Sequence, residues 1–203
     1  VPSHGKLNLN DLAGSCGRLD VLLRSLNSAL FLSHGIREDV EVILHLMGGE
    51  KPPRRIWIQG STVKGIHSDD RSIAGHISKI LQTPLPPKGF KKEFQNGLFH
   101  GQGGLKDTLI EWEKSETDVF VLDRSGKNVE LISESLKSRA FVISADKPFS
   151  EEELVLLSNF EKISVGQEWI QGHSVISISV SYTHLRANET YSYLVFPLQR
   201  EKK

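Results

Sequence analysis

The sequence predicts an α/β fold built on an open parallel sheet with helices on both faces. Segments 118–122 (DVFVL), 140–144 (AFVIS) and 162–165 (KISV) are apolar and rich in β-branched residues, as strands buried on both faces are. Helical connections are expected at about 133–138 and at 150–159, where the first turn is acidic. Strands that alternate with helices in this way pair in parallel.

Further elements are expected before this sheet. Segments 40–47 (VEVILHLM) and 55–59 (RIWIQ) have strand character, and glycines and prolines break the chain between them. A helix is expected over about 69–81, because Ser68 or Asp69 can cap it. A proline-rich loop follows, and a helix resumes over about 104–114.

The charge balance of the chain excludes little. The 203 residues carry 25 basic and 25 acidic side chains, so net charge does not decide whether the partner is an RNA. Local basic clusters are the candidates for RNA phosphate contacts, and a solvated loop is the equal alternative for each of them. The two clusters are Lys51, Arg54 and Arg55, then Lys88, Lys91 and Lys92.

Cysteine usage and hydropathy point to the cytoplasm. The single Cys16 excludes an intrachain disulfide and suits a reducing compartment. No run approaches the ~20 apolar residues of a membrane span, and residues 1–10 do not resemble a secretory signal. We therefore expect no membrane partner.

Residues 14–34 (GSCGRLDVLLRSLNSALFLSH) combine an apolar helical stripe with a polar face. Asp20, Arg24 and Asn27 recur three or four residues apart, away from the leucines. Such a helix buries one side and offers the other to a ligand. Solvated charges, or a pairing of Asp20 with Arg24, are the more common explanation for an arbitrary amphipathic helix.

This segment, continued to Val40, resembles the signature of the tRNA (pseudouridine-N1)-methyltransferase family, a branch of the SPOUT methyltransferases. The family pattern is close to GxxGRLDxxxRxxNxALFLSHxxRxDV, and the chain matches nearly every fixed position. Residues 59–61 with 68–73 resemble the family's EGS…PDERxI, and 97–105 (GLFHGQGGL) resembles its GIYVxRxGF block. The likeness extends weakly to about Ser179, so a SPOUT methyltransferase domain is expected over 1–179.

The resemblance implies a C-terminal trefoil knot whose loops hold S-adenosylmethionine. Ligands of open parallel sheets lie beyond the carboxyl ends of the strands, so the three loops there are expected to converge. A GxGxxG loop is absent, which argues against a standard dinucleotide site. The expected cofactor-binding residues are Leu122, Ser144, Ala145, Asp146, Val165, Gly166 and Gln167.

The family methylates N1 of pseudouridine in the T-arm of tRNA, a nitrogen whose proton must be removed or shared. Asp20 is the expected catalytic acceptor, on a polar face away from the three cofactor loops, and Arg18 is expected to hold a phosphate or a developing oxyanion. Arg24, Asn27 and Arg71 are the expected substrate-binding residues. The tRNA is thus the expected partner.

SPOUT relatives are dimers, so a homodimer is expected, with the helix at 17–34 as a plausible contact face. No metal is implied, because transfer from a sulfonium needs none. The nearest ligand cluster, His67 with Asp69 and Asp70, lacks a second His or a Cys.

The chain departs from the family pattern in several places. The strand expected before 7–14 is missing, residues 144–148 (SADKP) differ from the family's SDHxP or GDHxG loop, and Ser174 replaces a cysteine. Residues 174–182 alternate like a strand, but the family's final helix is expected there. Residues 180–203 resemble translated sequencing-adapter DNA and are expected to be a non-native or disordered tail. A catalytically inactive RNA-binding or structural relative, or a gene fragment truncated at both ends, is therefore the alternative.

Overall fold

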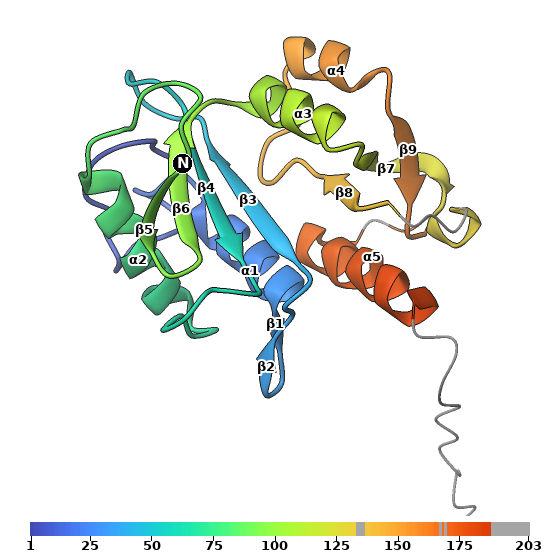
Figure 1. Ribbon diagram of the computed structural model, residues 1–203, viewed down its shortest axis with the longest axis horizontal. Helices are drawn as coiled ribbons and strands as arrows, with labels where there is room; N and C mark the ends of the chain where they lie inside the picture. The colour runs from blue at the N-terminus through green and yellow to red at the C-terminus, as the bar shows by residue number, and fades with distance from the viewer. Residues whose placement is uncertain (133–136, 167, 169, 188–203) are drawn as a thin grey trace, which may run out of the picture.

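The computed structural model describes residues 1–132, 137–166, 168 and 170–187. Two sheets with their helices form two halves of one molecule (Figure 1). The first half holds an antiparallel sheet, and the second half holds a parallel sheet. A short hairpin of β1 (Phe31–Leu32) and β2 (Gly35–Ile36) projects from the first half.

The antiparallel sheet has the strand order β3-β4-β6-β5. Its strands are β3 (Glu41–Leu46), β4 (Arg54–Gln59), β5 (Lys92–Gln95) and β6 (Leu98–Gln102). Helices α1 (Leu19–Leu30) and α2 (Asp70–Gln82) cover one face of it, because alternate strand residues such as Ile56 and Ile58 pack with the helix leucines and isoleucines in one core. Asp69 caps α2, as its side chain accepts from the Ser72 amide at 2.7 Å.

The parallel sheet has the order β8-β7-β9 and places β7 (Asp118–Asn128) between β8 (Arg139–Val142) and β9 (Glu161–Ser164). Its two faces have separate cores. Val121 and Val142 pack under α3 (Leu105–Lys114) and α4 (Glu151–Leu157). Phe120, Leu122 and Ile163 face the opposite side, with Val175 and Tyr182 of α5 (Gly172–Ala187). The expected parallel pairing and the helices on both faces are confirmed.

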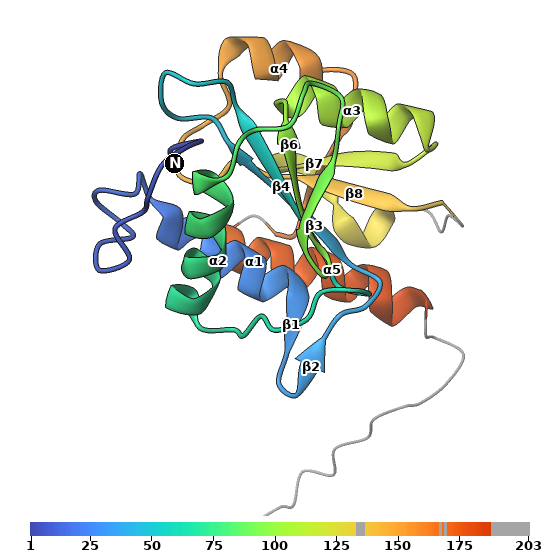
Figure 2. The same cartoon turned by 60° about the vertical axis from the view of Figure 1, so that its left-hand side comes forward.

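Helix α5 connects the two halves of the molecule. It lies between the parallel sheet and α1, and both views show it alongside α1 (Figures 1 and 2). The Tyr182 hydroxyl donates to Glu130 at 2.7 Å, next to the short 3₁₀ helix η1 (Val129–Leu131). The final helix expected from the family, rather than the strand that the local alternation suggests, is therefore present.

Some sequence expectations differ from the structure. The segments expected as strands at 40–47 and 55–59 form an antiparallel pair in a separate sheet, so the parallel sheet has three strands. The hairpin of β5 and β6 was not expected after the proline-rich loop. The expected domain end at 179 falls inside α5, where Val180 is buried.

Four expectations stay predictions, two of them because they concern residues outside the described ones. Most of the expected helix at 133–138 and all of 188–203 lie outside the described residues. The trefoil knot and the missing first strand remain predictions from the resemblance.

The contact face expected for a dimer is wrong. Leu19, Leu23, Leu26 and Leu30 form the apolar stripe of α1, and each is fully buried in the core of its own chain. The leucine spacing indicates correctly that one side of this helix is buried, but α2 and the antiparallel sheet already cover that side. The apolar stripe is therefore not available as a contact face for a second copy.

Candidate active site

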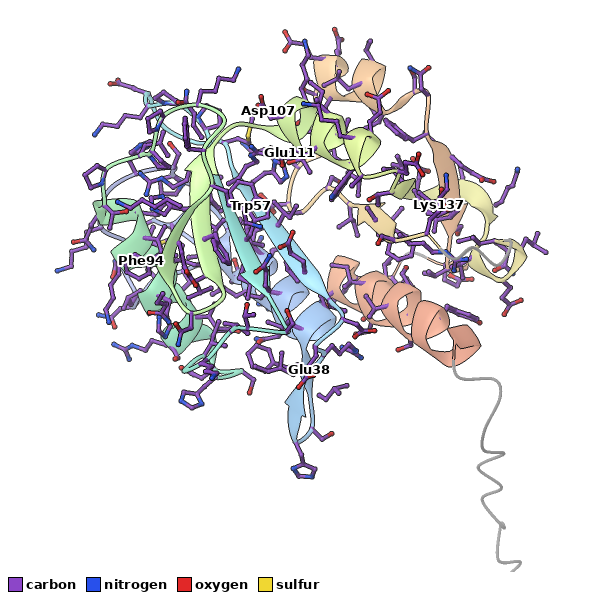
Figure 3. The ribbon with its side chains drawn as sticks, viewed as in Figure 1. Glu38, Trp57, Phe94, Asp107, Glu111 and Lys137 are labelled. Carbon is purple, nitrogen blue, oxygen red and sulfur yellow. The ribbon has the colours of Figure 1, made fainter. Side chains whose placement is uncertain are left out.

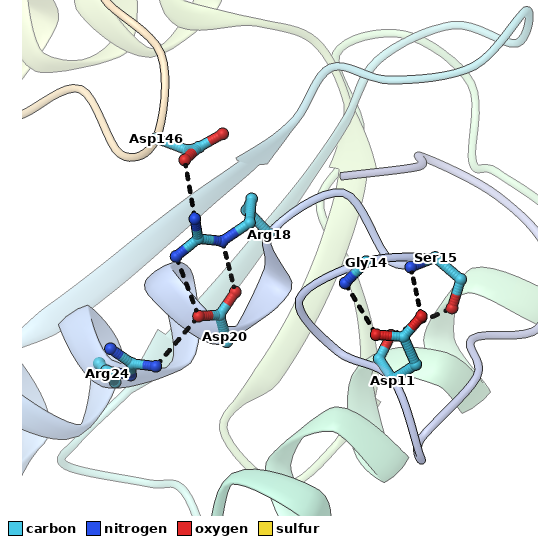
Figure 4. A network of polar contacts seen from close by, with 7 residues as sticks. All are labelled: Asp11, Gly14, Ser15, Arg18, Asp20, Arg24 and Asp146. Atoms are coloured by element: carbon cyan, nitrogen blue, oxygen red, sulfur yellow. Dashed lines mark hydrogen bonds and ion pairs between the residues drawn. The ribbon is translucent and has the colours of Figure 1, made fainter.

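An ion-pair cluster lies at the start of α1 (Figure 4). Arg18 donates through Nε and Nη2 to the two carboxylate oxygens of Asp20, at 3.0 and 3.2 Å. Arg24 donates to the same carboxylate at 3.1 Å, one helical turn further along. The signature motif therefore gathers two guanidinium groups on one carboxylate.

Arg18 is held in an unusual backbone conformation. It is the N-cap of α1 with φ 62° and ψ 36°, and Gly17 before it has φ 61°. A side-chain-bearing residue in this left-handed region costs about 1–2 kcal/mol. The two consecutive left-handed residues turn the chain so that the Arg18 side chain lies back over Asp20 rather than away from the helix.

The electrostatics of the cluster keep Asp20 ionised. The hydrogen bonds from Arg18 lower the pKa of Asp20 below its ordinary value, and the charges of Arg18 and Arg24 act in the same direction against the opposing effect of burial. The Asp20 side chain is 12 % exposed. A buried carboxylate with a lowered pKa is a good hydrogen-bond acceptor and a weak base, so the geometry favours sharing a proton over removing it.

The cluster extends to the second half of the molecule. Arg18 Nη1 lies 3.5 Å from Oδ1 of Asp146, in the loop after β8 (Figure 4). The expectation that Asp20 lies away from the cofactor loops is therefore wrong, because one guanidinium separates it from one of them. Sequence periodicity places residues on helix faces, but it does not say which distant loop packs against a helix.

The expected cofactor loops meet at one edge of the parallel sheet. Leu122 pairs with Ile163 across β7 and β9, and Val121 pairs with Val142 across β7 and β8, so the chain leaves β8 and β9 on either side of Leu122. Leu122 is buried, and Val165 packs against its core cluster. Ser144, Ala145 and Asp146 follow β8 at the same edge, and Gln167 lies outside the described residues.

The residues at this edge fit an adenosine-type ligand. Ser164 fixes the backbone of Gly166 through hydrogen bonds of 2.6 and 3.2 Å. No atom lies within 4 Å of the position that a Cβ on Gly166 would occupy, so the backbone there is open. Apolar side chains at Leu122 and Val165, backbone at Gly166 and a carboxylate at Asp146 are the types of group that nucleoside sites use.

The turn after Leu122 is held internally. Asp123 accepts from the amide and hydroxyl of Ser125 at 2.8 and 2.7 Å, and these hydrogen bonds lower the pKa of Asp123. A Cβ on Gly126 would lie 2.4 Å from the Ile163 nitrogen, so only glycine allows this turn to press against β9. These residues support the loop rather than face a ligand.

Two cavities are lined by other residues. One of about 270 Å³ is lined by Phe120, Leu131 and Glu161 among others. The other, of about 340 Å³, lies between residues 2–5 and 48–51. The residues lining these two cavities include none of the expected cofactor-binding residues.

The remaining expected substrate residues lie further along α1 and α2. Asn27 donates to Asp70 at 2.8 Å, and the exposed Arg71 donates to Asn10 at 2.7 Å. Asn27 therefore continues the polar face of Asp20 and Arg24 toward the first turn of α2. The structure brings Asn27 and Asp70 into contact, whereas Arg71 is joined to the N-terminal segment instead.

The first expected basic cluster is mostly structural. Arg54 is fully buried and donates to the carbonyls of Ile80 and Thr83 at the end of α2. Arg55 is also buried, and it pairs through two hydrogen bonds of 2.9 Å with Glu111 of α3, which is labelled in Figure 3. As candidates for phosphate contacts these two arginines are wrong, because their partners lie inside the chain.

Several signature residues of the three motif blocks have structural roles that the sequence did not reveal. Arg37 donates to the carbonyls of Ser28 and Ala29 at 3.1 and 3.0 Å and so caps the C-terminus of α1. A Cβ on Gly60 would lie 1.9 Å from the Arg37 carbonyl oxygen, and one on Gly97 would lie 2.3 Å from the Val63 nitrogen. The second block thus contacts the first at Gly60, and the third block contacts the spacer of the second at Gly97.

Other classes of site are not found in the described part of the chain. Within residues 1–132, 137–166, 168 and 170–187, no group of three His, Cys, Asp or Glu side chains is placed to hold a metal ion. Among the same residues, no helix has the length and apolar character needed to cross a bilayer.

Comparison with known proteins is consistent with this geometry. The family model described as putative SAM-dependent RNA methyltransferase matches residues 1–187. The chain belongs to this family. It is 36 % identical over 171 residues to the tRNA (pseudouridine(54)-N(1))-methyltransferase of Methanospirillum hungatei, covering 84 % of each chain. The enzyme of the same name from Haloferax volcanii is 36 % identical over 188 residues, covering 91 % of each.

The fold of this family member is also that of a solved structure. The crystal structure of Archaeoglobus fulgidus Nep1 bound to S-adenosylhomocysteine superposes with a TM-score of 0.61 at 21 % sequence identity. The match covers 85 % of this chain and 73 % of the Nep1 chain. At this identity the likeness concerns the fold, and it agrees with the parallel sheet flanked by helices described above.

Proposed function

We propose that this chain transfers the methyl group of S-adenosylmethionine to N1 of pseudouridine in the T-arm of tRNA. The single observation that carries the proposal is the contact of Arg18 with both Asp20 and Asp146, which joins the signature helix to a loop at the ligand-binding edge of the parallel sheet. Family membership and the relatives' names support the reaction and the substrate.

The roles of the residues follow from their chemistry. When bound, S-adenosylmethionine supplies a methyl group on a positively charged sulfur. The Asp20 carboxylate accepts a hydrogen bond from the N1–H of the base and so raises the electron density on that nitrogen. As N1 bonds to the methyl carbon and the methyl–sulfur bond breaks, N1 becomes strongly acidic, and its proton passes to Asp20 and from there to water. Arg18 and Arg24 neutralise the carboxylate and lie beside it, where one of them can donate to a uracil oxygen as negative charge develops.

The cofactor is proposed to bind at the edge formed by Leu122, Ser144 to Asp146, Val165 and Gly166, with Gln167 from the sequence. The apolar side chains give an adenine ring its contact area, and open backbone gives hydrogen-bonding groups. Asn27 and Arg71 are proposed to position the RNA along α1 and α2. Exposure of the Arg24 side chain at 52 % leaves it accessible to the same RNA.

The test is methyl transfer from tritiated S-adenosylmethionine to two synthetic T-arm stem–loops, one with pseudouridine and one with uridine at the same position. We expect label in the pseudouridine RNA alone, because uridine is attached to ribose through N1 and has no N1–H. Equal labelling of both RNAs would contradict the assignment of N1. Calorimetric titration with S-adenosylhomocysteine, run in parallel, tests the cofactor site independently.

A second candidate is an RNA-binding relative without catalysis. The observation that favours it is the loop at 144–148, which departs from the family pattern and whose Asp146 is bound by Arg18 rather than left free. This candidate predicts RNA binding without methyl transfer and without heat on addition of S-adenosylhomocysteine.

A homodimer in the cytoplasm is also proposed. Apolar side chains on α4, Leu154 at 49 % and Val155 at 71 % exposure, offer a surface for a second copy in place of the buried stripe of α1. Sedimentation velocity at tens of micromolar tests this, because an interface worth about 8 kcal/mol is occupied in that range. A monomer at that concentration would contradict the dimer.

A further inference from the structure

The charge of Arg18 is shared between two carboxylates before an RNA arrives. Two of its nitrogens hold Asp20 at 3.0 and 3.2 Å, and the third, Nη1, lies 3.5 Å from Asp146. A guanidinium is planar and rigid, and Nη1 carries two N–H groups, so one can face Asp146 while the other stays open to a second acceptor. An RNA oxygen at Arg18 therefore meets a cation whose charge Asp146 partly neutralises.

The two partners of Arg18 differ in how firmly they are held. Asp20 has a second ion pair with Arg24 at 3.1 Å, and its side chain is 12 % exposed. Asp146 is in a loop, and its side chain is 37 % exposed. Among the described residues, its carboxylate has a single ion pair, with Arg18. The Asp146 contact is therefore the one that a ligand can replace at low cost.

A cofactor at the edge of the parallel sheet has groups that compete for Asp146. The cofactor carries an ammonium group and ribose hydroxyls, all of which donate to a carboxylate. Asp146 follows Ser144 and Ala145 in the loop after β8, at that same edge. If Asp146 accepts from the cofactor, its negative charge no longer opposes the attraction of Arg18 for the RNA.

We infer that Asp146 is a positioning residue that couples the two binding sites: it restrains Arg18 until the cofactor binds, and cofactor binding then strengthens RNA binding. The inference rests on the proposed function, because it needs a nucleoside cofactor and an RNA. Reciprocity requires that RNA strengthen cofactor binding by the same factor. The coupling is specific to this chain's loop sequence, in which the aspartate stands at 146.

The experiment measures the Kd of a fluorescent pseudouridine T-arm stem–loop by anisotropy, without S-adenosylhomocysteine and with enough to saturate each protein. In the wild-type chain we expect the Kd to fall at least about fivefold on saturation, within the usual range of coupling between sites. In Asp146→Asn the Kd without S-adenosylhomocysteine is expected to be lower than in the wild-type chain. The ratio of the Kd without S-adenosylhomocysteine to the Kd with it is then expected to fall below about twofold. Asp146→Ala is expected to behave in the same way.

Glu151→Gln is the matched control, because it removes one carboxylate at the start of α4, in the first helical turn after the same loop. It is expected to keep the wild-type ratio. The inference is overturned if the wild-type ratio is within twofold of one, or if both Asp146 variants keep the wild-type ratio. Absence of any binding of S-adenosylhomocysteine or of RNA to the wild-type chain would instead overturn the proposed function, and the inference with it.

Discussion

The ion pair between Arg55 and Glu111 gives an unusual stability prediction, because its two ends differ in burial. The Arg55 side chain is 4 % exposed, whereas that of Glu111 is 49 % exposed. Arg55 also donates to the Thr108 hydroxyl at 3.1 Å and lies 4.6 Å from the centre of the Trp57 ring. The pair joins β4 to α3, and therefore one half of the molecule to the other (Figure 3).

We predict that removing the more exposed partner is the more destabilising change. Glu111→Ala removes the salt-bridge partner of the buried Arg55 charge, a loss that typically costs about 3–5 kcal/mol and that the nearby Asp107 charge reduces toward the lower end. Arg55→Met keeps most of the side-chain volume and leaves Glu111 to water. It loses four hydrogen bonds worth a net ~0.5–1.5 kcal/mol each and a cation–π contact worth ~0.5–1 kcal/mol. It also removes the desolvation cost of a buried guanidinium, which is several kcal/mol and offsets most of that loss, so we expect a net cost of about 1–2 kcal/mol.

The assay is urea unfolding followed by tryptophan fluorescence, with Glu113→Ala as the matched control on the same helix. The double variant Arg55→Met with Glu111→Ala is expected to resemble Arg55→Met alone, because the exposed carboxylate has no remaining partner to lose. If Glu111→Ala costs less than about 1 kcal/mol, the pair behaves as an ordinary surface salt bridge, and the reasoning from burial fails.

Two further stability predictions follow from buried groups. Burial, reinforced by the Arg55 charge, lowers the pKa of His45 to about 4, so the unfolded chain binds the proton more readily between pH 4 and 6.5. The stabilising contribution of neutral His45 is therefore present above pH 6.5 and lost as the pH falls, and the free energy of unfolding drops by about 2 kcal/mol from pH 7.5 to 5.0 because of this residue. Urea titrations at the two pH values check this. In His45→Gln the two free energies of unfolding should lie closer together. Gly97→Ala should cost at least about 2 kcal/mol, because φ is +72° and the Cβ would lie 2.3 Å from the Val63 nitrogen. Gly75→Ala in α2, where nothing lies within 4 Å, should leave stability unchanged or raise it by up to about 1 kcal/mol; equal losses in thermal unfolding of the two variants would contradict this account.

The fold was predictable where local pattern determines it. The run of apolar residues at 118–122 predicts a buried strand, and Asp69 predicts the start of α2, because both signals involve neighbours in sequence. The hairpin at β5 and β6 was not predictable from periodicity. Its strands are short, and one of them, Lys92–Gln95, is polar enough to read as a loop.

The candidate site was predictable in composition but not in arrangement. The spacing of Asp20 and Arg24 predicts their contact, since residues four apart lie on one helix face. The contact of Arg18 with Asp146 spans 128 positions and depends on how α1 packs against the second half of the molecule. Arg55 was misassigned to RNA for the same reason, because its partner Glu111 is 56 positions away.

The most direct test of the central claim is methyl transfer by Asp20→Asn, with Asp11→Asn as the matched control. Asp11 undergoes the same chemical change in the same segment, but it holds the turn at Gly14 and Ser15 and has no contact with Asp20. We expect Asp20→Asn to lower the rate of transfer to the pseudouridine stem–loop by about 100- to 10,000-fold. Binding of S-adenosylhomocysteine to this variant should stay within a few-fold of wild type, and Asp11→Asn should stay close to wild type in both measurements. An Asp20→Asn variant that kept more than about a tenth of the wild-type rate would show that Asp20 serves only as the partner of Arg18 and Arg24.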